Sequence, residues 1–277
     1  MKKHLLVSGI LILTLLTSMS LASAEVITPD TQPERAAFYI DGQPTQLGTD
    51  PFVVGSTTYV SVRAFSEAMG ADSVTWDSGT ATVTAPGLTL KATAGSIYLE
   101  ANGRYLFVPK GCFVISNSLM APVRVLAKAF DATVSWDAAT QAVFITKGTG
   151  AIKPGSEFYD ETDLKWLSRI INAEARGESM TGKIAVGGVI MNRVASSKFP
   201  NTIHDVIFDR RNGVQFTPAY SGAIYNTPSA ESIIAAKIVL DGGNTAGNAL
   251  YFASTKNCWA AKTRPYAMTI GNHTFYA

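Results

Sequence analysis

One carboxylic acid, Glu174, has a sequence position from which it could act as a general acid. Leu167 and Ile170 precede it by seven and four residues, so the three side chains fall on one face of a predicted helix. Gly177 ends that helix, which places Glu174 close to the carbonyl groups of the last turn. Burial and these carbonyls both raise its pKa, the direction that a general acid needs near neutral pH. A carboxylate turned out to water, or paired with Arg176, is the alternative.

The elements that must hold this side chain follow from periodicity and capping signals. Asp160 can cap the predicted helix, and a second helix ends near residues 192–193. A third helix begins at 227–228, where a proline suits the first turn, and ends at 241–243. Residues 251–252 lie on a predicted strand. The surroundings of the glutamate are therefore predicted to be mainly helical with a small β element.

Six short sequence words follow one another through this half of the chain. They are INAEARGE (171–178), GKIAVGGVIMNRV (182–194), FPNTI (199–203), VQFTP (214–218), NALYFAS (248–254) and IGNHTFY (270–276). Any one of them is weak evidence, but the ordered series resembles the SleB-type spore cortex-lytic enzyme and cell wall hydrolase family over residues 159–277.

This resemblance implies an α+β fold with a lysozyme-like, mainly helical catalytic domain. It places the family's single essential glutamate at the first Glu of EARGE, which is Glu174 here. It also implies a lytic transglycosylase that binds peptidoglycan glycan strands, cleaves between N-acetylmuramic acid and N-acetylglucosamine and leaves a 1,6-anhydro end. In such a reaction the sugar's own C6 hydroxyl attacks, so one carboxyl can serve first as acid and then as base.

A loop and a strand supply candidate substrate contacts. Gln215 and Phe216 lie in a Gly-rich loop, where an amide and a ring suit sugar binding and where the resembling family keeps a QF pair. Phe216 could equally anchor the loop in the core. Neighbouring side chains of a strand point to opposite sides, so we expect Tyr251 to face substrate and Phe252 the core. Trp259, in a predicted loop, could stack on a sugar or cover the core.

Glu178 and His273 complete the predicted substrate-binding set. Glu178 follows Glu174 by four residues, and its position also suits a cap of the next helix. His273 could contact substrate or have a structural role. The region holds only one other histidine, His204, so no zinc site is expected, and neither a metal nor a cofactor is predicted. Further carboxylates of the region are Glu161, Asp205 and Asp209.

The first half of the chain contains an internal repeat. Arg63 and Trp76 of one copy correspond to Arg124 and Trp136 of the other, 61 and 60 positions later. The first copy predicts a β run over 52–59, a helix over 64–70 and strands over 73–76 and 80–85, and the second predicts the same elements over 113–119, 125–131, 133–136 and 142–146. These elements predict an N-terminal α+β domain built from two β-α-β-β-like repeats.

The repeat-containing segment, residues 37–147, resembles the copper amine oxidase N-terminal-like domain of bacterial surface proteins on its VR and WD spacing. It contains no histidine, so copper ligation by imidazole is not expected. We interpret it as a wall-binding or spacer module.

Composition and the N-terminus bound the function further. The net charge of the 277 residues is +2, with −3 over residues 25–150 and +3 over 151–277. This positive charge is too small to predict a nucleic-acid-binding surface. The chain has only two cysteines, which excludes a disulfide-rich scaffold. Residues 1–24 predict a secretory signal peptide, with an uncleaved anchor helix as the alternative. We therefore expect linkers at 25–36 and 148–158, no stable membrane insertion after cleavage, and a location in the cell wall or spore envelope of a bacterium.

Two rival functions remain open at this point. A muramidase-type hydrolase would use a second carboxylate as base or nucleophile. A non-enzymatic wall-binding protein is the other rival, and the retained Glu174 argues against it. The sequence leaves open whether the target is spore cortex or vegetative wall, and it indicates no protein partner.

Overall fold

The computed structural model describes residues 36–211, 213–255 and 257–277, which belong to one compact unit, Pro33–Ala277. The predicted signal peptide and nearly all of the first linker lie outside the described residues. The described residues build two hydrophobic cores, one within residues 36–152 and one formed mainly by residues 164–275. None of their helices combines the length and the apolar character that a bilayer crossing would require.

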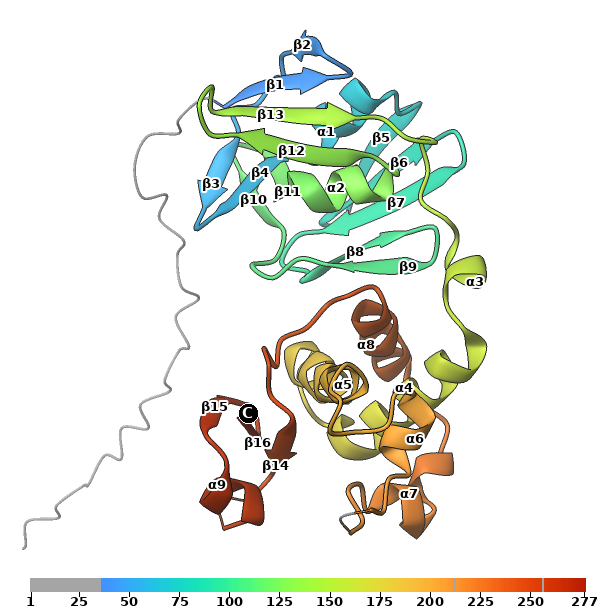
Figure 1. The fold of residues 1–277 in the computed structure, drawn as a ribbon. Helices are drawn as coiled ribbons and strands as arrows, with labels where there is room; N and C mark the ends of the chain where they lie inside the picture. The colour runs from blue at the N-terminus through green and yellow to red at the C-terminus, as the bar shows by residue number, and fades with distance from the viewer. Residues whose placement is uncertain (1–35, 212, 256) are drawn as a thin grey trace, which may run out of the picture. The chain divides into compact units, whose positions relative to one another are not determined.

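The two cores correspond to a β-rich repeat domain (residues 37–147) and a mainly helical domain (residues 159–277), as the predicted α+β class requires (Figure 1). The elements of the repeat domain are β1 Ala37–Ile40, β2 Gln43–Thr45, β3 Phe52–Val54, β4 Thr57–Ser61, α1 Val62–Met69, β5 Ser73–Asp77, β6 Thr80–Ala85, β7 Leu88–Thr93, β8 Tyr98–Ala101, β9 Arg104–Phe107, β10 Phe113–Ile115, β11 Ser118–Pro122, α2 Val123–Ala129, β12 Thr133–Asp137 and β13 Ala142–Thr146. After α3 Gly155–Phe158, the helical domain contains α4 Glu161–Ala175, α5 Met180–Val194, α6 Ile203–Ile207, α7 Pro218–Ser221, the 3-10 helix η1 Ala223–Tyr225, α8 Ala230–Leu240, β14 Tyr251–Ala253, α9 Trp259–Thr263, β15 Tyr266–Ile270 and β16 His273–Tyr276.

Each repeat copy folds as a hairpin, a helix and a second hairpin. The first copy is β3–β4, α1 and β5–β6, and the second is β10–β11, α2 and β12–β13. The predicted single β runs over 52–59 and 113–119 are therefore wrong. A tight turn splits each of them, at Gly55 in one copy and at Ser116 and Asn117 in the other, and all three residues have positive φ.

The two copies meet in the four-stranded sheet β10-β11-β4-β3. Its central strands, β4 and β11, are equivalent strands of the two copies, and they pair antiparallel with Val60 opposite Ala121. Phe65 of α1 and Phe130 after α2 bring their ring centroids to 6.0 Å. The antiparallel pairing of equivalent strands relates the copies by an approximate two-fold rotation.

The three long helices of the helical domain begin at side-chain caps. Asp160 accepts hydrogen bonds from two backbone N–H groups at 2.9 Å and caps α4, as predicted. Ser179 caps α5, and Ser229 caps α8. Because Ser229 is the cap, α8 starts at Ala230, two residues after the predicted start at Pro228.

Helices α4, α5 and α8 approach one another closely at Gly187. A Cβ atom at this position would lie 2.9 Å from Ile171 Cδ1 of α4 and 2.9 Å from Val239 Cγ2 of α8. At the next residue, Gly188, a Cβ atom would lie 2.5 Å from Asn244 Oδ1. The glycine pair therefore lets the helix that follows Glu174 pack tightly into the core.

The segment that was predicted as a second linker is packed rather than extended. Thr149 Oγ1 donates to Asp131 Oδ2 at 2.8 Å, and Ile152 is only 4% exposed in the core of the repeat domain. The segment then enters α3 and reaches Tyr159, whose hydroxyl donates to Asp241 Oδ2 at 2.6 Å.

Asp241, at the end of α8, gathers partners from the repeat domain as well. Its side chain is 1% exposed and accepts hydrogen bonds from Arg104 Nε, at 3.2 Å, and from Arg104 Nη2. Lys128 Nζ lies 3.2 Å from Asp241 Oδ1. A buried carboxylate is tolerated because several donors compensate its lost hydration.

Replacing Arg104 with alanine should therefore destabilise the protein by about 3 kcal/mol, because the buried Asp241 carboxylate loses the guanidinium that donates two hydrogen bonds to it. The midpoint of urea unfolding measures this loss. Arg63→Ala is the matched control: Arg63 and Glu67 are 3.5 Å apart and more than half exposed, so this change should cost less than about 1 kcal/mol. Equal losses in the two variants would contradict the stabilising role of the Asp241 cluster.

Candidate functional site

Glu174 lies in the last turn of α4, one residue before the helix ends at Ala175. It is partly buried, and the loss of solvation raises its pKa above the ordinary value of a glutamate. The predicted direction of this pKa shift is thus confirmed, with burial as its cause. The ion pair with Arg176, which the sequence left open, is not found among the contacts of the described residues.

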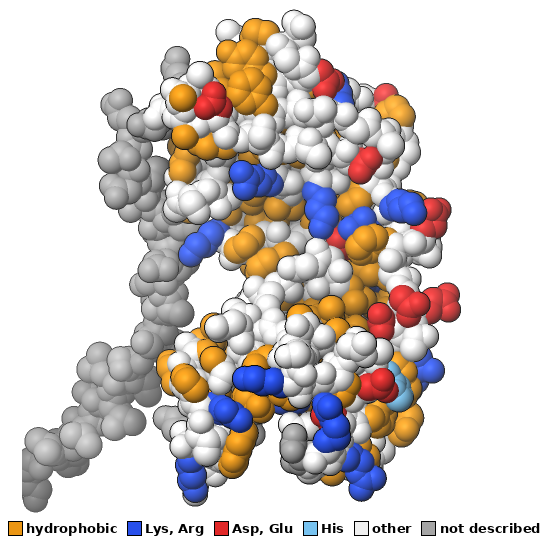
Figure 2. Space-filling view, viewed as in Figure 1, with side chains coloured by type: hydrophobic (Ala, Val, Ile, Leu, Met, Phe, Trp, Pro, Cys, Tyr) orange, Lys and Arg blue, Asp and Glu red, His pale blue; other side chains and the backbone are white. Residues whose placement is uncertain are grey.

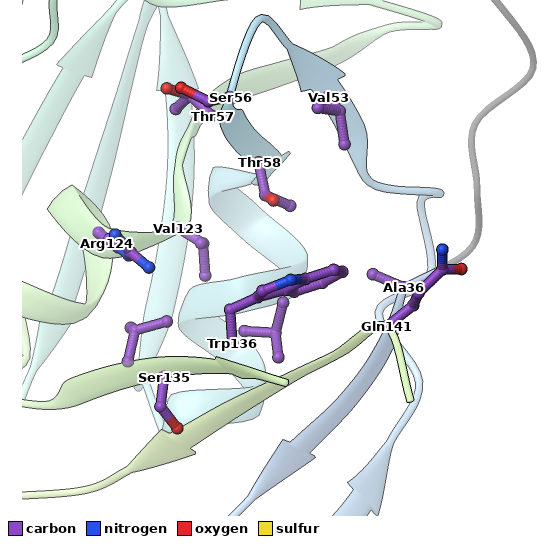
Figure 3. A pocket seen from close by; sticks show the side chains of 12 residues that line it. Ala36, Val53, Ser56, Thr57, Thr58, Val123, Arg124, Ser135, Trp136 and Gln141 are labelled. Atoms are coloured by element: carbon purple, nitrogen blue, oxygen red, sulfur yellow. The ribbon is translucent and has the colours of Figure 1, made fainter. Parts of the chain in front are cut away.

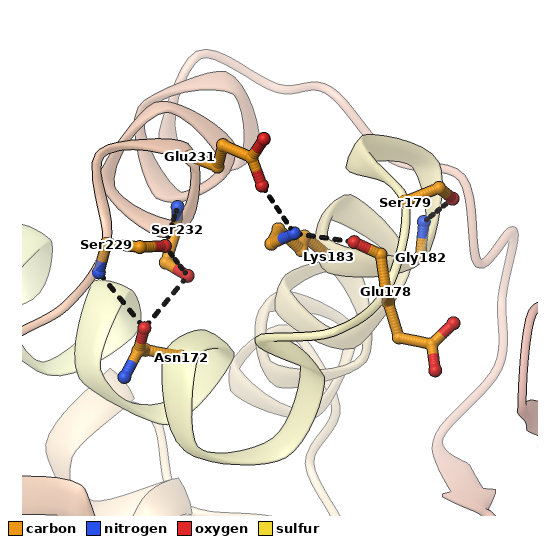
Figure 4. A network of polar contacts seen from close by, with 8 residues as sticks. All are labelled: Asn172, Glu178, Ser179, Gly182, Lys183, Ser229, Glu231 and Ser232. Atoms are coloured by element: carbon orange, nitrogen blue, oxygen red, sulfur yellow. Dashed lines mark hydrogen bonds and ion pairs between the residues drawn. The ribbon is translucent and has the colours of Figure 1, made fainter.

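Asn172 fixes the last turn of α4 to the start of α8 (Figure 4). Its Oδ1 accepts a hydrogen bond from the Ser229 backbone N–H at 3.0 Å and from Ser232 Oγ at 3.3 Å. Asn172 and Ser232 are both buried, so these hydrogen bonds replace the water contacts that the amide oxygen and the hydroxyl lose on folding. The helix turn that carries Glu174 is therefore held by hydrogen bonds as well as by packing.

Lys183 holds the loop that follows Glu174. Its side chain is only 2% exposed, and its Nζ donates to the Glu178 backbone carbonyl at 2.5 Å and to Glu231 Oε2 at 2.8 Å. The ammonium also lowers the pKa of Glu231 through this hydrogen bond. Figure 4 places Lys183 between α8 and the loop, with the Glu178 side chain pointing away from it. The buried lysine thus joins α5, α8 and the loop.

Glu178 does not cap the next helix, so that sequence expectation is wrong. Ser179 occupies the cap position, and the Glu178 carboxylate instead accepts from Asn272 Nδ2 at 2.9 Å and the Asn272 backbone N–H at 3.3 Å. A Cβ atom at Gly271 would lie 1.9 Å from Glu178 Oε2, so only glycine fits beside the carboxylate. With 8% of its side chain exposed, Glu178 ties the β15–β16 turn to the α4–α5 loop. This placement favours a structural role over substrate contact.

His273 lies beside this carboxylate and is 7% exposed. Its Nδ1 is 3.8 Å from Glu178 Oε1 and has no hydrogen-bond partner within the described part of the chain. Burial lowers the pKa of the imidazole, partly offset by Glu178, so the neutral ring is favoured near pH 7. The ring packs edge-on against Phe252, with centroids 5.3 Å apart, which favours the structural role that the sequence left open.

The loop residues Gln215 and Phe216 are placed differently from each other. Gln215 is partly exposed and its Nε2 donates to the Gly213 carbonyl at 3.3 Å. Phe216 is 2% exposed and belongs to the hydrophobic core, with its ring 6.1 Å from that of Phe252. Phe216 is therefore placed to anchor the loop, and Gln215 is the member of the pair that can reach a ligand.

Tyr251 and Phe252 point to opposite sides of β14, as strand geometry predicts. Phe252 packs against the core, whereas Tyr251 contacts Trp259 at a ring distance of 5.6 Å. Trp259 is 57% exposed and opens the short helix α9, where a loop was expected. Arg264 lies over both rings, at 5.0 Å from Tyr251 and 4.8 Å from Trp259. No sequence word pointed to Arg264, because its relation to these rings arises only from the fold.

Two further carboxylates of the region, Asp205 and Asp209, have partners of their own. Asp209 binds the Arg211 guanidinium through both oxygens, and these hydrogen bonds lower its pKa. Asp205 lies 3.0 Å from His204 Nδ1, and this contact lowers the pKa of the carboxyl. Among the described residues, no three His, Cys, Asp or Glu side chains come together as a metal ion would require.

Charge on the surface is dispersed. On the face drawn in Figure 2, Lys and Arg side chains lie singly or in small groups, with hydrophobic, uncharged and some acidic side chains between the groups. This face therefore offers no continuous basic field of the kind that binds nucleic acid.

Two family models match the chain. The cell wall hydrolase model matches residues 177–276, and the copper amine oxidase N-terminal domain model matches residues 39–145. The first match begins three residues after Glu174, so the glutamate lies just outside it.

The chain is also similar to individual proteins. A spore cortex-lytic enzyme of Bacillus cereus is 38% identical over 122 residues, which are 42% of this chain and 45% of that enzyme. The cell wall hydrolase CwlJ of Oceanobacillus iheyensis is 31% identical over 100 residues, 34% of this chain and 70% of that protein. A solved catalytic domain of the germination-specific lytic transglycosylase SleB from Bacillus anthracis is 35% identical, and the match covers 45% of this chain and 100% of that domain with a TM-score of 0.40. The chain thus spans less than half of the Bacillus cereus enzyme.

Replacing Glu174 with glutamine should stabilise the protein at pH 7 and change its stability little below about pH 4. Folding raises the pKa of Glu174, so the native state keeps a proton that the unfolded state releases above its own pKa of about 4.3. The stability of the unmodified protein therefore falls as the pH rises from the pKa of Glu174 in the unfolded state to its higher pKa in the native state. Glutamine does not titrate, so the variant does not show this loss. Melting temperatures of both proteins at the two pH values measure the difference.

Glu161→Gln provides the control for this pH experiment. Glu161 is exposed in the first turn of the same helix, where a carboxylate is favoured by the helix N-terminus, so glutamine should bring no gain at pH 7. A gain for Glu174→Gln of the same size at both pH values would refute the titration of a buried carboxyl as its cause.

Proposed function

Because this chain belongs to the cell wall hydrolase family, we propose that it cleaves the glycan strands of peptidoglycan with Glu174 as the proton donor. The observation that carries the proposal is the partly buried Glu174 carboxyl, whose pKa is raised and whose helix end is fixed by Asn172 and Lys183. A carboxyl whose pKa is raised keeps its proton to a higher pH, and it can give that proton to the oxygen of a glycosidic bond as the bond breaks.

The proposed reaction is that of a lytic transglycosylase. Glu174 gives its proton to the oxygen that links N-acetylmuramic acid to N-acetylglucosamine, and the C1–O bond breaks as an oxocarbenium-like centre forms. The resulting carboxylate then accepts the proton of the C6 hydroxyl of the same muramic acid. The O6 oxygen attacks C1 and closes a 1,6-anhydro ring, so Glu174 ends the reaction protonated.

The other carboxylates support a reaction that uses one acid. Glu178 is held by Asn272, and Asp209 is held by Arg211. A muramidase-type hydrolase needs a second carboxylate that is open to water or substrate. Product analysis distinguishes the two reactions, because hydrolysis leaves a reducing end and transglycosylation leaves the anhydro ring.

Location and target are also part of the proposal. Several of the named relatives are spore cortex-lytic enzymes. This supports cortex peptidoglycan as the substrate and a role in spore germination. The predicted signal peptide supports secretion to the wall or spore envelope. A lysozyme-like arrangement of the helical domain is the fold that we infer from the same family.

Replacing Glu174 with glutamine should lower the rate of glycan cleavage by about 10²- to 10⁴-fold or more, because general acid catalysis is lost. Glutamine keeps the size of the side chain but cannot deliver a proton. The measurement is mass analysis of fragments released from purified cortex peptidoglycan, which should carry anhydro ends when the unmodified protein is used.

Glu178→Gln is the matched control for this change. It should keep most of the cleavage rate, because Glu178 is bound to Asn272 and its loss affects the turn rather than the reaction. Equal collapse of both variants with reducing-end products would favour the two-carboxylate hydrolase. An active Glu174→Gln protein would remove the assignment.

Tyr251 and Phe252 offer a second test on one strand. Tyr251→Ala should raise KM for soluble glycan fragments several-fold with a smaller loss of stability than Phe252→Ala, because its ring is partly exposed and contacts Trp259 and Arg193. Phe252→Ala should lower stability by about 3 kcal/mol, because it removes a ring that packs on the core. Steady-state kinetics and urea unfolding of both variants give the comparison, and an unchanged KM for Tyr251→Ala would remove it from the substrate site.

A further inference from the structure

The repeat domain contains two cavities, of about 470 and 850 Å³. The first, called cavity 1, is lined by the β3–β4 hairpin, the start of α2 and strand β12. The second, called cavity 2, is lined by the β10–β11 hairpin, the start of α1 and strand β5. Each cavity therefore joins the first hairpin of one repeat copy to the helix and strand of the other copy.

Residues at equivalent positions of the two copies line the two cavities, and the segment 45–49 contributes further residues to cavity 2 alone. The pairs, with the residue of cavity 1 first, are Val53 and Val114, Arg124 and Arg63, and Trp136 and Trp76. Their separations in the chain are 61, 61 and 60 residues, which is the period of the internal repeat. The cavities thus follow from the approximate two-fold relation of the copies.

Large apolar side chains are exposed only at these cavities within the described part of the repeat domain. The four residues and their exposed fractions are Val53 at 53%, Trp76 at 51%, Val114 at 50% and Trp136 at 46%. All four line a cavity. Apolar groups exposed at a concave site, beside a few polar ones, are typical of a binding site rather than of a core.

We propose that the two cavities are equivalent binding sites for the glycan strand of peptidoglycan. In Figure 3 the Trp136 indole lies across the middle of cavity 1, with Arg124 to one side and Gln141 to the other. A flat indole suits the apolar face of a sugar ring, the amide and nearby hydroxyl groups suit sugar hydroxyls, and the arginine can donate hydrogen bonds to the carbonyl oxygens of N-acetyl and lactyl groups. The choice of this polymer rests on the proposed function of Glu174.

Charge favours a weakly acidic polymer over a polyanion. Residues 25–150 carry a net charge of −3, so nucleic acid would be repelled. The arginine of cavity 2, Arg63, lies 3.5 Å from Glu67, whereas Arg124 of cavity 1 has no ion pair within the described residues. Each cavity is lined by one arginine, and cavity 1 is the more cationic of the two.

Two sites on one domain give binding by avidity. The wall is a polymer with many repeated sugars, so both cavities can be filled at the same time by one protein molecule. A second, linked binding event raises the overall affinity by about 10²- to 10⁴-fold over a single site.

The test uses the full mature chain with Glu174→Gln, so that the glycan is bound but not cut. Sedimentation with purified sacculi and with peptide-free glycan strands measures affinity. Trp136→Ala and Trp76→Ala should each weaken binding about tenfold, and the double variant by at least about 100-fold. Tyr225→Ala removes an aromatic ring of the helical domain that is 59% exposed, and it should leave binding unchanged.

The outcomes of these experiments separate the glycan-binding proposal from the proposed catalytic role of Glu174. Unchanged binding by the double variant, or binding of isolated stem peptides but not of peptide-free strands, would overturn the glycan sites. Two measurements show whether the tryptophan variants are folded. Their unfolding midpoints should match that of the parent protein, and with Glu174 intact they should cleave soluble glycan fragments at an unchanged rate. If Glu174→Gln still cleaves glycan, the proposed function fails, while the sedimentation of the tryptophan variants still reports on the cavities.

Discussion

The close approach of α4, α5 and α8 at Gly187 is the constraint on which the position of Glu174 depends. Any side chain at Gly187 would displace Ile171 or Val239, and Ile171 lies within one helical turn of Glu174. Glu174 is itself partly buried, and that loss of solvation raises its pKa. The packing of the three helices therefore sets the position of the carboxyl, and its burial sets the direction of the pKa shift.

Polar contacts extend this constraint to the end of the chain. Glu178 and Asn272 are 94 positions apart, yet their hydrogen bonds join the loop after α4 to the β15–β16 turn. Gly271 leaves room for the carboxylate, and Lys183 holds the backbone of the same loop from the other side. The sequence words INAEARGE and IGNHTFY are thus joined in the fold, and Asn172, Glu178 and Asn272 hold the backbone around Glu174 through their hydrogen bonds.

Local signals in the sequence predicted what depends on local physics. The Asp160 cap and the apolar face of α4 follow from spacing within a few turns, and the direction of the Glu174 pKa shift followed from that face. The role of Glu178 could not be predicted, because its partner is distant in the chain. The turn in the second copy has a weak sequence signal, because Ser116 and Asn117, at positive φ, replace the glycine that marks such turns, whereas Gly55 did mark the turn in the first copy and was overlooked within the apolar run.

The two repeat copies diverge where the helical domain packs against them. Glu67 in the first copy corresponds to Lys128 in the second, 61 positions later. Glu67 pairs with Arg63 on its own helix, whereas Lys128 lies 3.2 Å from the buried Asp241. A glutamate at position 128 would place a second negative charge beside that carboxylate, so the contact with α8 requires the change of sign. The same change removes the acidic neighbour of Arg124, so packing of the helical domain also sets the charge difference between the two cavities.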